Sequence, residues 1–396
     1  MRGFNRGKQS GWFKLKFFAS VLALLWLWQS SLVLAQQARY EPVPVLSASK
    51  ILPPELLSGP NHRVQERVTS DGIVNIYTID SKFGTFRAVS TATLRIRIQE
   101  INAMAVMDQL KTTKEFGNAV KEAALNTMVA AKNMVFQPVK TLGEAVSGVG
   151  LMFRRAGDSM FGAKRSDAED SRFKNLIGFS NYKREYAYEL GVDVYSRNEV
   201  LQDRLNDIAW TGFAGGLTVS LALAAVPGGA GIAMTAIGAT RLSTAIFKTT
   251  PPQDLRRMNT EKLTAMGIDP DTIETFINAS IFTPREQTLL VAALDEMKGV
   301  ADRERFVQMA ALTHNPDVAF FRQRQADMYA GYHRAVSPIE RFIGVGPVPG
   351  ARTVNGSLVF NIPVDYVAWT EEVAKVITTA SGLADQLPGI RDKQLW

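Results

Sequence analysis

Residue types that the sequence lacks exclude several kinds of chemistry. The chain of 396 residues has no cysteine and only three histidines, His62, His314 and His333. Without cysteine there is no disulfide, thiolate metal ligand, cysteine nucleophile or acylated cysteine. The histidines form no His-x-x-x-His or His-Glu-x-x-His pattern, so we expect no metal site built on them. We interpret His314 as a helix-end residue and His333 as a surface residue.

The chain also has almost no net charge outside residues 1–35. The formal net charge of +7 includes five basic residues and no acid within residues 1–35. The remaining chain has 40 Lys and Arg against 38 Asp and Glu. Proteins that bind nucleic acid present a strongly basic face, so we expect no nucleic-acid partner.

Residues 1–35 have the three parts of a secretory signal. The five basic residues precede an uncharged run from Phe17 to Ala35, which ends in Val33-Leu34-Ala35. A basic region, an apolar region and a cleavage site with small residues are typical of a secretory signal peptide. We predict an exported, bacterial-type protein that is periplasmic or associated with the cell envelope, cleaved after Ala35. Because the run has 19 residues, enough to span a bilayer, retention as an N-terminal anchor is the alternative.

The hydrophobic pattern predicts a mainly α-helical fold, a multi-helix bundle with a small β element near each end of residues 36–396. Residues 36–63 are rich in proline and are expected to form an extended lead-in. Residues 64–90 predict a small antiparallel β element, with strands Val64–Thr69, Ile73–Ile79 and Thr85–Val89. Its apolar face needs helices to pack against, because three short strands bury little alone.

Long amphipathic helices are predicted over residues 91–165. The first has apolar residues at helical spacing, namely Leu94, Ile98, Ile101 and Ala105. A stripe with an 11-residue period follows, marked by Phe116, Val120, Ala124, Met128, Ala131, Val135, Leu142, Val146, Val149 and Phe153. Pro138 and Gly143 should divide it. Residues 111–165 carry nine basic and four acidic residues, so this helix suits either a lipid surface or the protein's own core.

Residues 166–250 are expected to form helices that include an apolar hairpin. After a polar loop at 164–174, a helix starts near Asn181, is broken by residues 191–198, and resumes with Asn198 as N-cap. Residues 208–240 contain no charge in 33 positions, with Pro227-Gly228-Gly229 near the middle. This predicts a helical hairpin over 208–247. Its two arms are long enough either to insert into a membrane or to form a buried core hairpin.

Residues 251–345 predict a bundle of capped helices. Each of four dipeptides, Asp269-Pro270, Thr283-Pro284, Asn315-Pro316 and Ser337-Pro338, places a capping side chain before a first-turn proline. Thr283 with Glu286, and Ser337 with Glu340, also have capping-box spacing. In residues 346–396, Asn355-Gly356 predicts a β-hairpin between Ala351–Val354 and Ser357–Ile362. A helix over about residues 365–380 and a loosely ordered tail from Gln386 are expected to follow.

Candidate catalytic motifs have simpler explanations. Gly157-x-x-x-x-Gly162-Ala163-Lys164 matches a phosphate loop poorly, and the glycines at 228–231 lack dinucleotide spacing. A carboxylate mechanism needs two acids that converge on a cleft, which sequence pairs such as Glu169-Asp170 and Glu371-Glu372 do not show. Glu371-Glu372 is typical of a solvated helix face, and Asp269 with Asp271 suits capping. The catalytic residues therefore stay unknown, and no cofactor or metal is expected.

Three functions remain open. The first is a non-enzymatic cell-envelope protein with membrane-surface or membrane-inserting helices at 111–165 and 208–247, acting as a scaffold, lipid-associated or pore-like protein. The second is a soluble periplasmic hydrolase that uses carboxylates. The third is a soluble helical module that binds a protein partner through residues 254–342.

Overall fold

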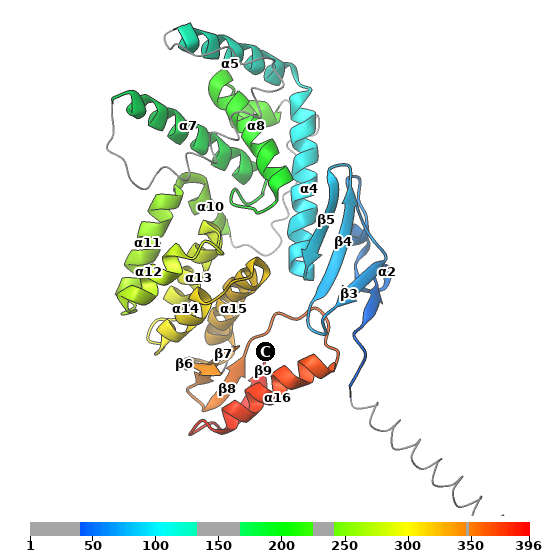
Figure 1. The fold of residues 1–396 in the computed structure, drawn as a ribbon, viewed down its shortest axis with the longest axis vertical. Coiled ribbons are helices and arrows are strands. Elements are labelled where there is room, and N and C mark those ends of the chain that lie inside the picture. Colours follow the sequence, from blue (N-terminus) through cyan, green and yellow to red (C-terminus); the bar gives the residue numbers. More distant parts are fainter. Residues whose placement is uncertain (1–39, 133–166, 225–240, 346–347) are drawn as a thin grey trace, which may run out of the picture.

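The computed structural model describes residues 40–132, 167–224, 241–345 and 348–396 (Figure 1). The described chain is mainly α-helical and has a small sheet towards each end, as the sequence predicts. In the chain, the helices α4 to α15 lie between the two sheets.

The N-terminal sheet has five strands rather than the three predicted. Part of the expected lead-in is folded, because residues 45–64 contain two strands and two short helices, α2 and α3. The strands are β1 (Val45–Ser47), β2 (His62–Val64), β3 (Arg67–Ser70), β4 (Asn75–Ser81) and β5 (Gly84–Val89), and the helices are α2 (Ala48–Ile51) and α3 (Pro54–Leu57). Strand β4 pairs antiparallel with β2 and β3 along one edge and with β5 along the other. Its residues Asn75, Tyr77 and Ile79 are buried, so the predicted apolar face is confirmed.

Helix α4 (Thr91–Lys111) covers this sheet through its contacts with β5 and β4 (Figure 1). Leu94, Ile98, Ile101 and Ala105 are all buried, which confirms the predicted spacing. Ser90 caps the helix, because its side chain accepts a hydrogen bond from the Thr93 amide. The sheet and α4 therefore form one core.

A second group of helices extends this core away from the sheet. It contains α5 (Lys114–Lys132), α7 (Asp167–Glu189), α8 (Glu199–Gly215), α9 (Val219–Ala224) and α10 (Arg241–Thr249). Helix α8 packs against α4, α5 and α7, while α10 packs against α7. Asn198 caps α8 as predicted. The predicted polar loop at 164–174 is wrong from residue 167 onward, because α7 begins there.

The predicted apolar stripe is offset where the structure describes it. In α5, Phe116, Ala119 and Ala123 are buried whereas Val120 is 38% exposed. The buried face is thus set by packing on α8, one position away from the 11-residue register. The remainder of the stripe, from residue 133, lies outside the described residues.

The predicted first arm of the apolar hairpin is not one helix. Helix α8 ends at Gly215, and Gly216 adopts a left-handed conformation with φ 68° before α9 begins. Ile208, Ala209 and Gly212 are buried in the protein core. The turn at 227–229 and the start of the second arm lie outside the described residues. No helix in the described ranges is long and apolar enough to cross a membrane.

The capped bundle contains α11 (Pro252–Ala265), α12 (Pro270–Asn278), α13 (Pro284–Glu296), α14 (Arg303–Ala311) and α15 (Pro316–Ala335). Asp269, Thr283 and Asn315 cap α12, α13 and α15 with their side chains, and Thr283 forms the predicted capping box with Glu286. These local predictions are confirmed.

The fourth predicted helix start is wrong, since Ser337-Pro338 leads into a strand. Strand β6 (Ile339–Val345) pairs antiparallel with β7 (Val348–Thr353) and buries Ile339 and Phe342. Non-local pairing of a segment rich in β-branched residues overrides the local capping signal.

The C-terminal sheet continues with the predicted hairpin and ends with a strand that was not predicted. Strand β8 (Ser357–Phe360) pairs with β7 across the Asn355-Gly356 turn, where Gly356 has φ 84°. Helix α16 (Glu371–Asp385) starts later than expected, with Thr370 as its cap. The tail is ordered, because β9 (Asp392–Leu395) pairs in parallel with β8.

Candidate functional site

The structure brings polar side chains together where the loop at 191–198 meets the rest of the protein, and Glu100, Asn198 and Glu286 among them are buried. We call Glu100, Ser196, Arg197, Asn198 and Glu286 the polar junction. Gly191, with φ 66°, turns the chain at the end of α7, and Asn198 starts α8. The loop between them therefore projects its side chains towards α4 on one side and α13 on the other.

Glu100 is the buried acid of the polar junction. It lies on α4 and is only 1% exposed. Its carboxylate accepts hydrogen bonds from the Asn198 side chain at 2.9 Å, from Arg97 at 2.5 Å and from the Ser196 hydroxyl. A buried carboxylate that accepts hydrogen bonds from several donors is held in one position. Glu100 therefore ties the loop to α4.

Arg197 extends the polar junction to the capped bundle. Its guanidinium donates two hydrogen bonds to the Glu286 carboxylate, at 2.7 and 2.6 Å, and one to the Ile281 carbonyl at 2.5 Å. Glu286 also accepts from the Thr283 amide at 2.8 Å as part of the capping box. One carboxylate thus orders a helix start and a contact between distant parts of the chain.

Neighbouring titratable groups are shifted by burial. Burial raises the pKa of Asp193, whose carboxylate accepts a hydrogen bond from the Tyr195 amide at 2.9 Å. Burial also raises the pKa of Tyr195 to about 12. Among the described residues, the Tyr195 hydroxyl and the Arg184 Nε have no hydrogen-bond partner. The carboxylates of Glu100 and Glu286, by contrast, are occupied by protein donors, so the geometry of the junction fits a structural linkage.

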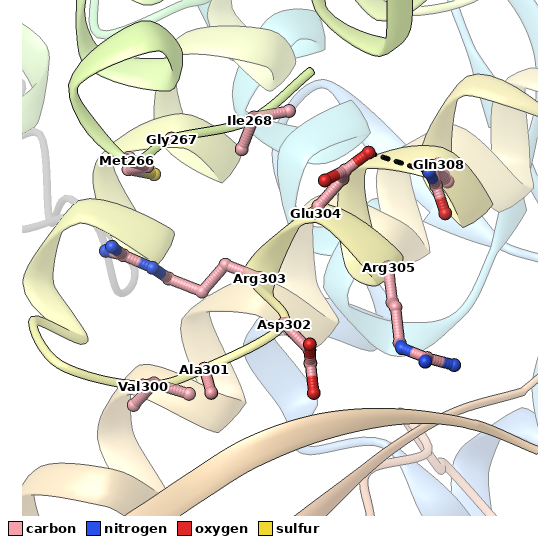
Figure 2. A pocket seen from close by; sticks show the side chains of 10 residues that line it. All are labelled: Met266, Gly267, Ile268, Val300, Ala301, Asp302, Arg303, Glu304, Arg305 and Gln308. Carbon is pink, nitrogen blue, oxygen red and sulfur yellow. Dashed lines mark hydrogen bonds between the residues drawn. The ribbon is translucent and has the colours of Figure 1, made fainter.

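An open cleft of about 600 Å³ lies in the capped bundle (Figure 2). It is bounded by the end of α11 and the start of α14 and is lined by Met266, Gly267, Ile268, Val300, Ala301, Asp302, Arg303, Glu304, Arg305 and Gln308. Asp302 precedes α14 in a left-handed conformation, with φ 57°. Both acidic and basic side chains therefore border the cleft.

The two acids of this cleft do not converge. Figure 2 shows Asp302 and Glu304 pointing in different directions. Glu304 accepts hydrogen bonds from Gln308 at 2.9 Å and from Thr272 at 3.3 Å, while Asp302 lies 3.7 Å from Arg341. A carboxylate mechanism needs an acid and a base around one reacting bond. The pair is not arranged in that way.

The three histidines lie apart and have separate surroundings. His62 is buried, its Nε2 lies 3.3 Å from the Leu56 carbonyl, and burial lowers its pKa. His333 accepts a hydrogen bond from the Ile339 amide at 3.0 Å through Nδ1. His314 is exposed in the turn before α15. In the described ranges, no three His, Asp or Glu side chains are placed to hold a metal ion.

The remaining sequence candidates are explained by helix ends or are not described. Asp269 accepts a hydrogen bond from the Thr272 amide at 3.1 Å, which is its capping role. Glu371 and Glu372 are exposed in the first turn of α16. Glu169 and Asp170 lie in the first turn of α7. The segments 157–164 and 228–231 lie outside the described residues.

Comparison with known proteins identifies no relative. No family model, curated protein or solved structure matches this chain.

The sequence alone does not reveal the polar junction. Its hydrogen bonds join residues that are 89 to 98 positions apart. One available signal was the position of Glu100 between Ile98 and Ile101, on a helix whose apolar residues are buried. An acid at such a position predicts a buried partner, because burying an unpaired charge is costly.

Proposed function

We propose that the chain is an exported, non-enzymatic cell-envelope protein that contacts membrane lipid through residues 111–165 and 208–247. Its role would be that of a scaffold or lipid-associated protein. If the same residues inserted into the bilayer, the role would be pore-like. Support comes from the charge pattern of these two segments and from the packing of the helices next to them.

The main support is that both segments connect helices of the same group, namely α5, α7, α9 and α10. Residues 133–166 connect α5 to α7, and residues 225–240 connect α9 to α10. Helix α9 packs against both α5 and α7, and α10 packs against α7. A segment with more basic than acidic residues and an uncharged segment therefore start from neighbouring helices.

The chemistry of the two segments is complementary at a lipid surface. Residues 133–166 include Lys140, Arg154, Arg155, Lys164 and Arg165 against Glu144 and Asp158, and residues 225–240 carry no charge. Basic side chains near an anionic surface contribute about 1 kcal/mol each, and apolar side chains add to this by leaving water. Together they favour a contact that depends partly on salt.

A fluorescent label tests this proposal directly. The chain has no cysteine, so Ala233→Cys provides a single attachment site within the uncharged segment. The full-length variant, labelled and added to vesicles that contain anionic lipid and a lipid-borne quencher, should lose much of its fluorescence. Leu312→Cys, which places the label on the capped bundle where Leu312 is 72% exposed, is the control. Equal quenching of the two labels would contradict the proposal.

Charge reversal tests the basic segment. Lys140→Glu, Arg154→Glu and Arg155→Glu together should weaken quenching at position 233 by about 100-fold or more in lipid concentration, at roughly 1 kcal/mol for each charge lost. Reversing Arg257, Lys298 and Arg334, which lie on the capped bundle, should have little effect. An equal loss with both sets of reversals would show a general charge effect and contradict a role of this segment.

The helical binding module is a second candidate because of the open cleft at α14. A partner held there would contact Arg305 and Gln308, which line it (Figure 2). A photo-crosslinking residue in place of Gln308 should then give one defined crosslink to a partner peptide in cells. The same residue at Arg257, outside the cleft, should not give that peptide. Identical products from both positions would remove this candidate.

A further inference from the structure

Residues 361–370, which we call the strap, run from the C-terminal sheet back to the N-terminal sheet. The Asp365 carboxylate accepts hydrogen bonds from the amides of Asn75 at 3.0 Å and Thr91 at 2.9 Å. The Ala368 amide donates to the Gly72 carbonyl at 3.1 Å. These contacts fix which side of the strap faces the protein.

The outward side of the strap is apolar. Asp365 faces inward with Ala368 and Thr370, which are 2% and 3% exposed. Tyr366, Val367 and Trp369 are 41%, 58% and 40% exposed. A loop in water usually places its polar side chains outward, and this arrangement is the reverse. Grouped exposed apolar residues are typical of a contact surface.

The start of the described chain extends this surface. Tyr40 and Val43 are 37% and 63% exposed. The intervening Glu41 pairs with Trp369, because the Glu41 amide donates to the Trp369 carbonyl at 2.9 Å and its carboxylate accepts from the Trp369 amide at 3.1 Å. We call Tyr40, Val43, Tyr366, Val367 and Trp369 the strap face. The hydrogen bonds between Glu41 and Trp369 bring the two segments that carry these residues next to each other.

The strap face lies close to the uncharged run in the sequence. Four residues separate Ala35 from Tyr40. Five chain steps reach at most about 18 Å when fully extended. Any bilayer spanned by residues 17–35 would therefore lie within that distance of Tyr40. Tyr and Trp are the residues enriched where a protein meets the membrane–water interface.

Of the two alternatives for residues 17–35, cleavage and retention, we propose that they are retained as a membrane anchor and that the strap face lies on the phospholipid bilayer that they span. The five basic residues before the run keep the N-terminus on the cytoplasmic side, so the folded part lies on the opposite side. The contact is made by aromatic and apolar side chains entering the interface. It places a second lipid-facing surface on the protein, separate from the segments of the proposed function.

Position and charge distinguish the two surfaces. The strap ends at α16, which lies towards the opposite end of the long axis from α5 (Figure 1). The charged residues that flank the strap face in the sequence are Glu41, Glu371, Glu372 and Lys375. Acids outnumber bases among them, so they provide no attraction to anionic lipid. Contact through the strap face is therefore expected to be insensitive to salt, unlike contact through the segment at 133–166.

Single-cysteine labelling in the full chain tests the inference. Val367→Cys carries the label on the strap face, and Leu312→Cys is again the control. Both variants are purified from membranes and reconstituted into phosphatidylcholine vesicles with a lipid-borne quencher. We expect quenching at 367 to be several-fold stronger than at 312. It should not change when NaCl is raised from about 0.15 M to about 0.5 M, which shortens the Debye length roughly twofold. Equal quenching at the two positions would overturn the inference.

Two further measurements complete the test. Tyr366→Ser with Trp369→Ser should reduce quenching at 367, whereas Val336→Ser with Val354→Ser, which are 57% and 58% exposed elsewhere, should not. An equal reduction by both pairs would overturn the role of the strap face. The mass of the membrane product should include residues 1–35. A product that begins at Gln36 would overturn the retained anchor.

Discussion

At the scale of single residues, buried polar groups decide how this protein responds to substitution and pH. The Glu100 carboxylate accepts hydrogen bonds from three side chains. His62 has one hydrogen-bond contact, at Nε2, and its Nδ1 has no partner among the described residues. These two residues are both buried, but Glu100 has several hydrogen-bond donors, whereas burial lowers the pKa of His62.

Glu100→Gln should destabilise the protein by about 3 kcal/mol, because it removes the buried charge that pairs with Arg97 and leaves one acceptor oxygen where Arg97, Ser196 and Asn198 use two. Urea unfolding followed by circular dichroism measures the change. Glu372→Gln, an exposed acid in α16, is the control and should cost less than about 0.5 kcal/mol. Equal effects would show that the polar junction contributes nothing beyond surface charge.

His62 should make the folded state less stable in mild acid. Its pKa is lowered below 6.5 by burial, so the unfolded chain binds a proton before the folded protein does. The stability that this residue provides is complete above pH 6.5 and is lost as the pH falls towards the folded pKa. Free energies of unfolding between pH 7.5 and 5 should fall more steeply for the wild type than for His62→Gln. Parallel curves would contradict this.

Asp327 should have the opposite effect. Burial raises its pKa to about 6, although Gln323 donates a hydrogen bond to it. The folded protein therefore binds a proton before the unfolded chain, and stability increases as the pH falls through 6. Asp327→Asn should raise the melting temperature by about 3 °C or more at pH 8, and by progressively less towards pH 4. A constant shift at every pH would count against a titrating carboxyl.

At the scale of elements, local signals predicted the helices well and the strands less well. Asp269, Thr283 and Asn315 bond to amides two or three residues away, so the information lies within one turn. Strand β6 depends on β7, and β9 depends on β8 across residues 361–391. A four-residue polar strand such as β9 has no periodicity to detect.

The candidate site was less predictable than the fold for the same reason. The cap at Asn198 could be predicted because it acts on α8 next to it. The pairing of Arg197 with Glu286 could not, because it requires knowing how the two groups of helices pack. Glu286 was predicted only as part of a capping box, and the structure gives it the second role.

A pair of substitutions compares the correct and incorrect cap predictions. Thr283→Ala removes a capping-box hydroxyl and should cost about 1 kcal/mol. Ser337→Ala should cost almost nothing, because the buried Ser337 hydroxyl has no partner among the described residues. Urea midpoints measure both. A larger loss for Ser337→Ala would show that its hydroxyl has a partner in solution.

At the scale of the whole molecule, two large apolar cores share one chain. The first contains the N-terminal sheet with α4, α5, α7, α8 and α9, and the second contains the capped bundle with part of the C-terminal sheet. Arg197 joins them at Glu286, and the strap joins them at Asp365. Both links are polar, so they determine orientation more than they add buried apolar area.

Arg197→Ala should weaken the coupling between the two cores. We expect calorimetric unfolding to broaden or divide into two transitions, and a double-mutant cycle with Glu286→Gln to give a coupling energy of about 1–2 kcal/mol. Arg257→Ala with Glu261→Gln, an exposed pair within α11, should give less than about 0.5 kcal/mol. A single unchanged transition for Arg197→Ala would locate the coupling elsewhere.

The position of Asp365 also determines the order in which the chain can finish folding. Its carboxylate accepts from Asn75 and Thr91, which precede it by 290 and 274 residues. As the chain is synthesised from its N-terminus, the first sheet and the start of α4 form while these two amides still face water. Their final partner arrives only when the last tenth of the protein has emerged. A nascent chain that stops before the strap therefore leaves these two amides, at the starts of β4 and α4, without their side-chain partner.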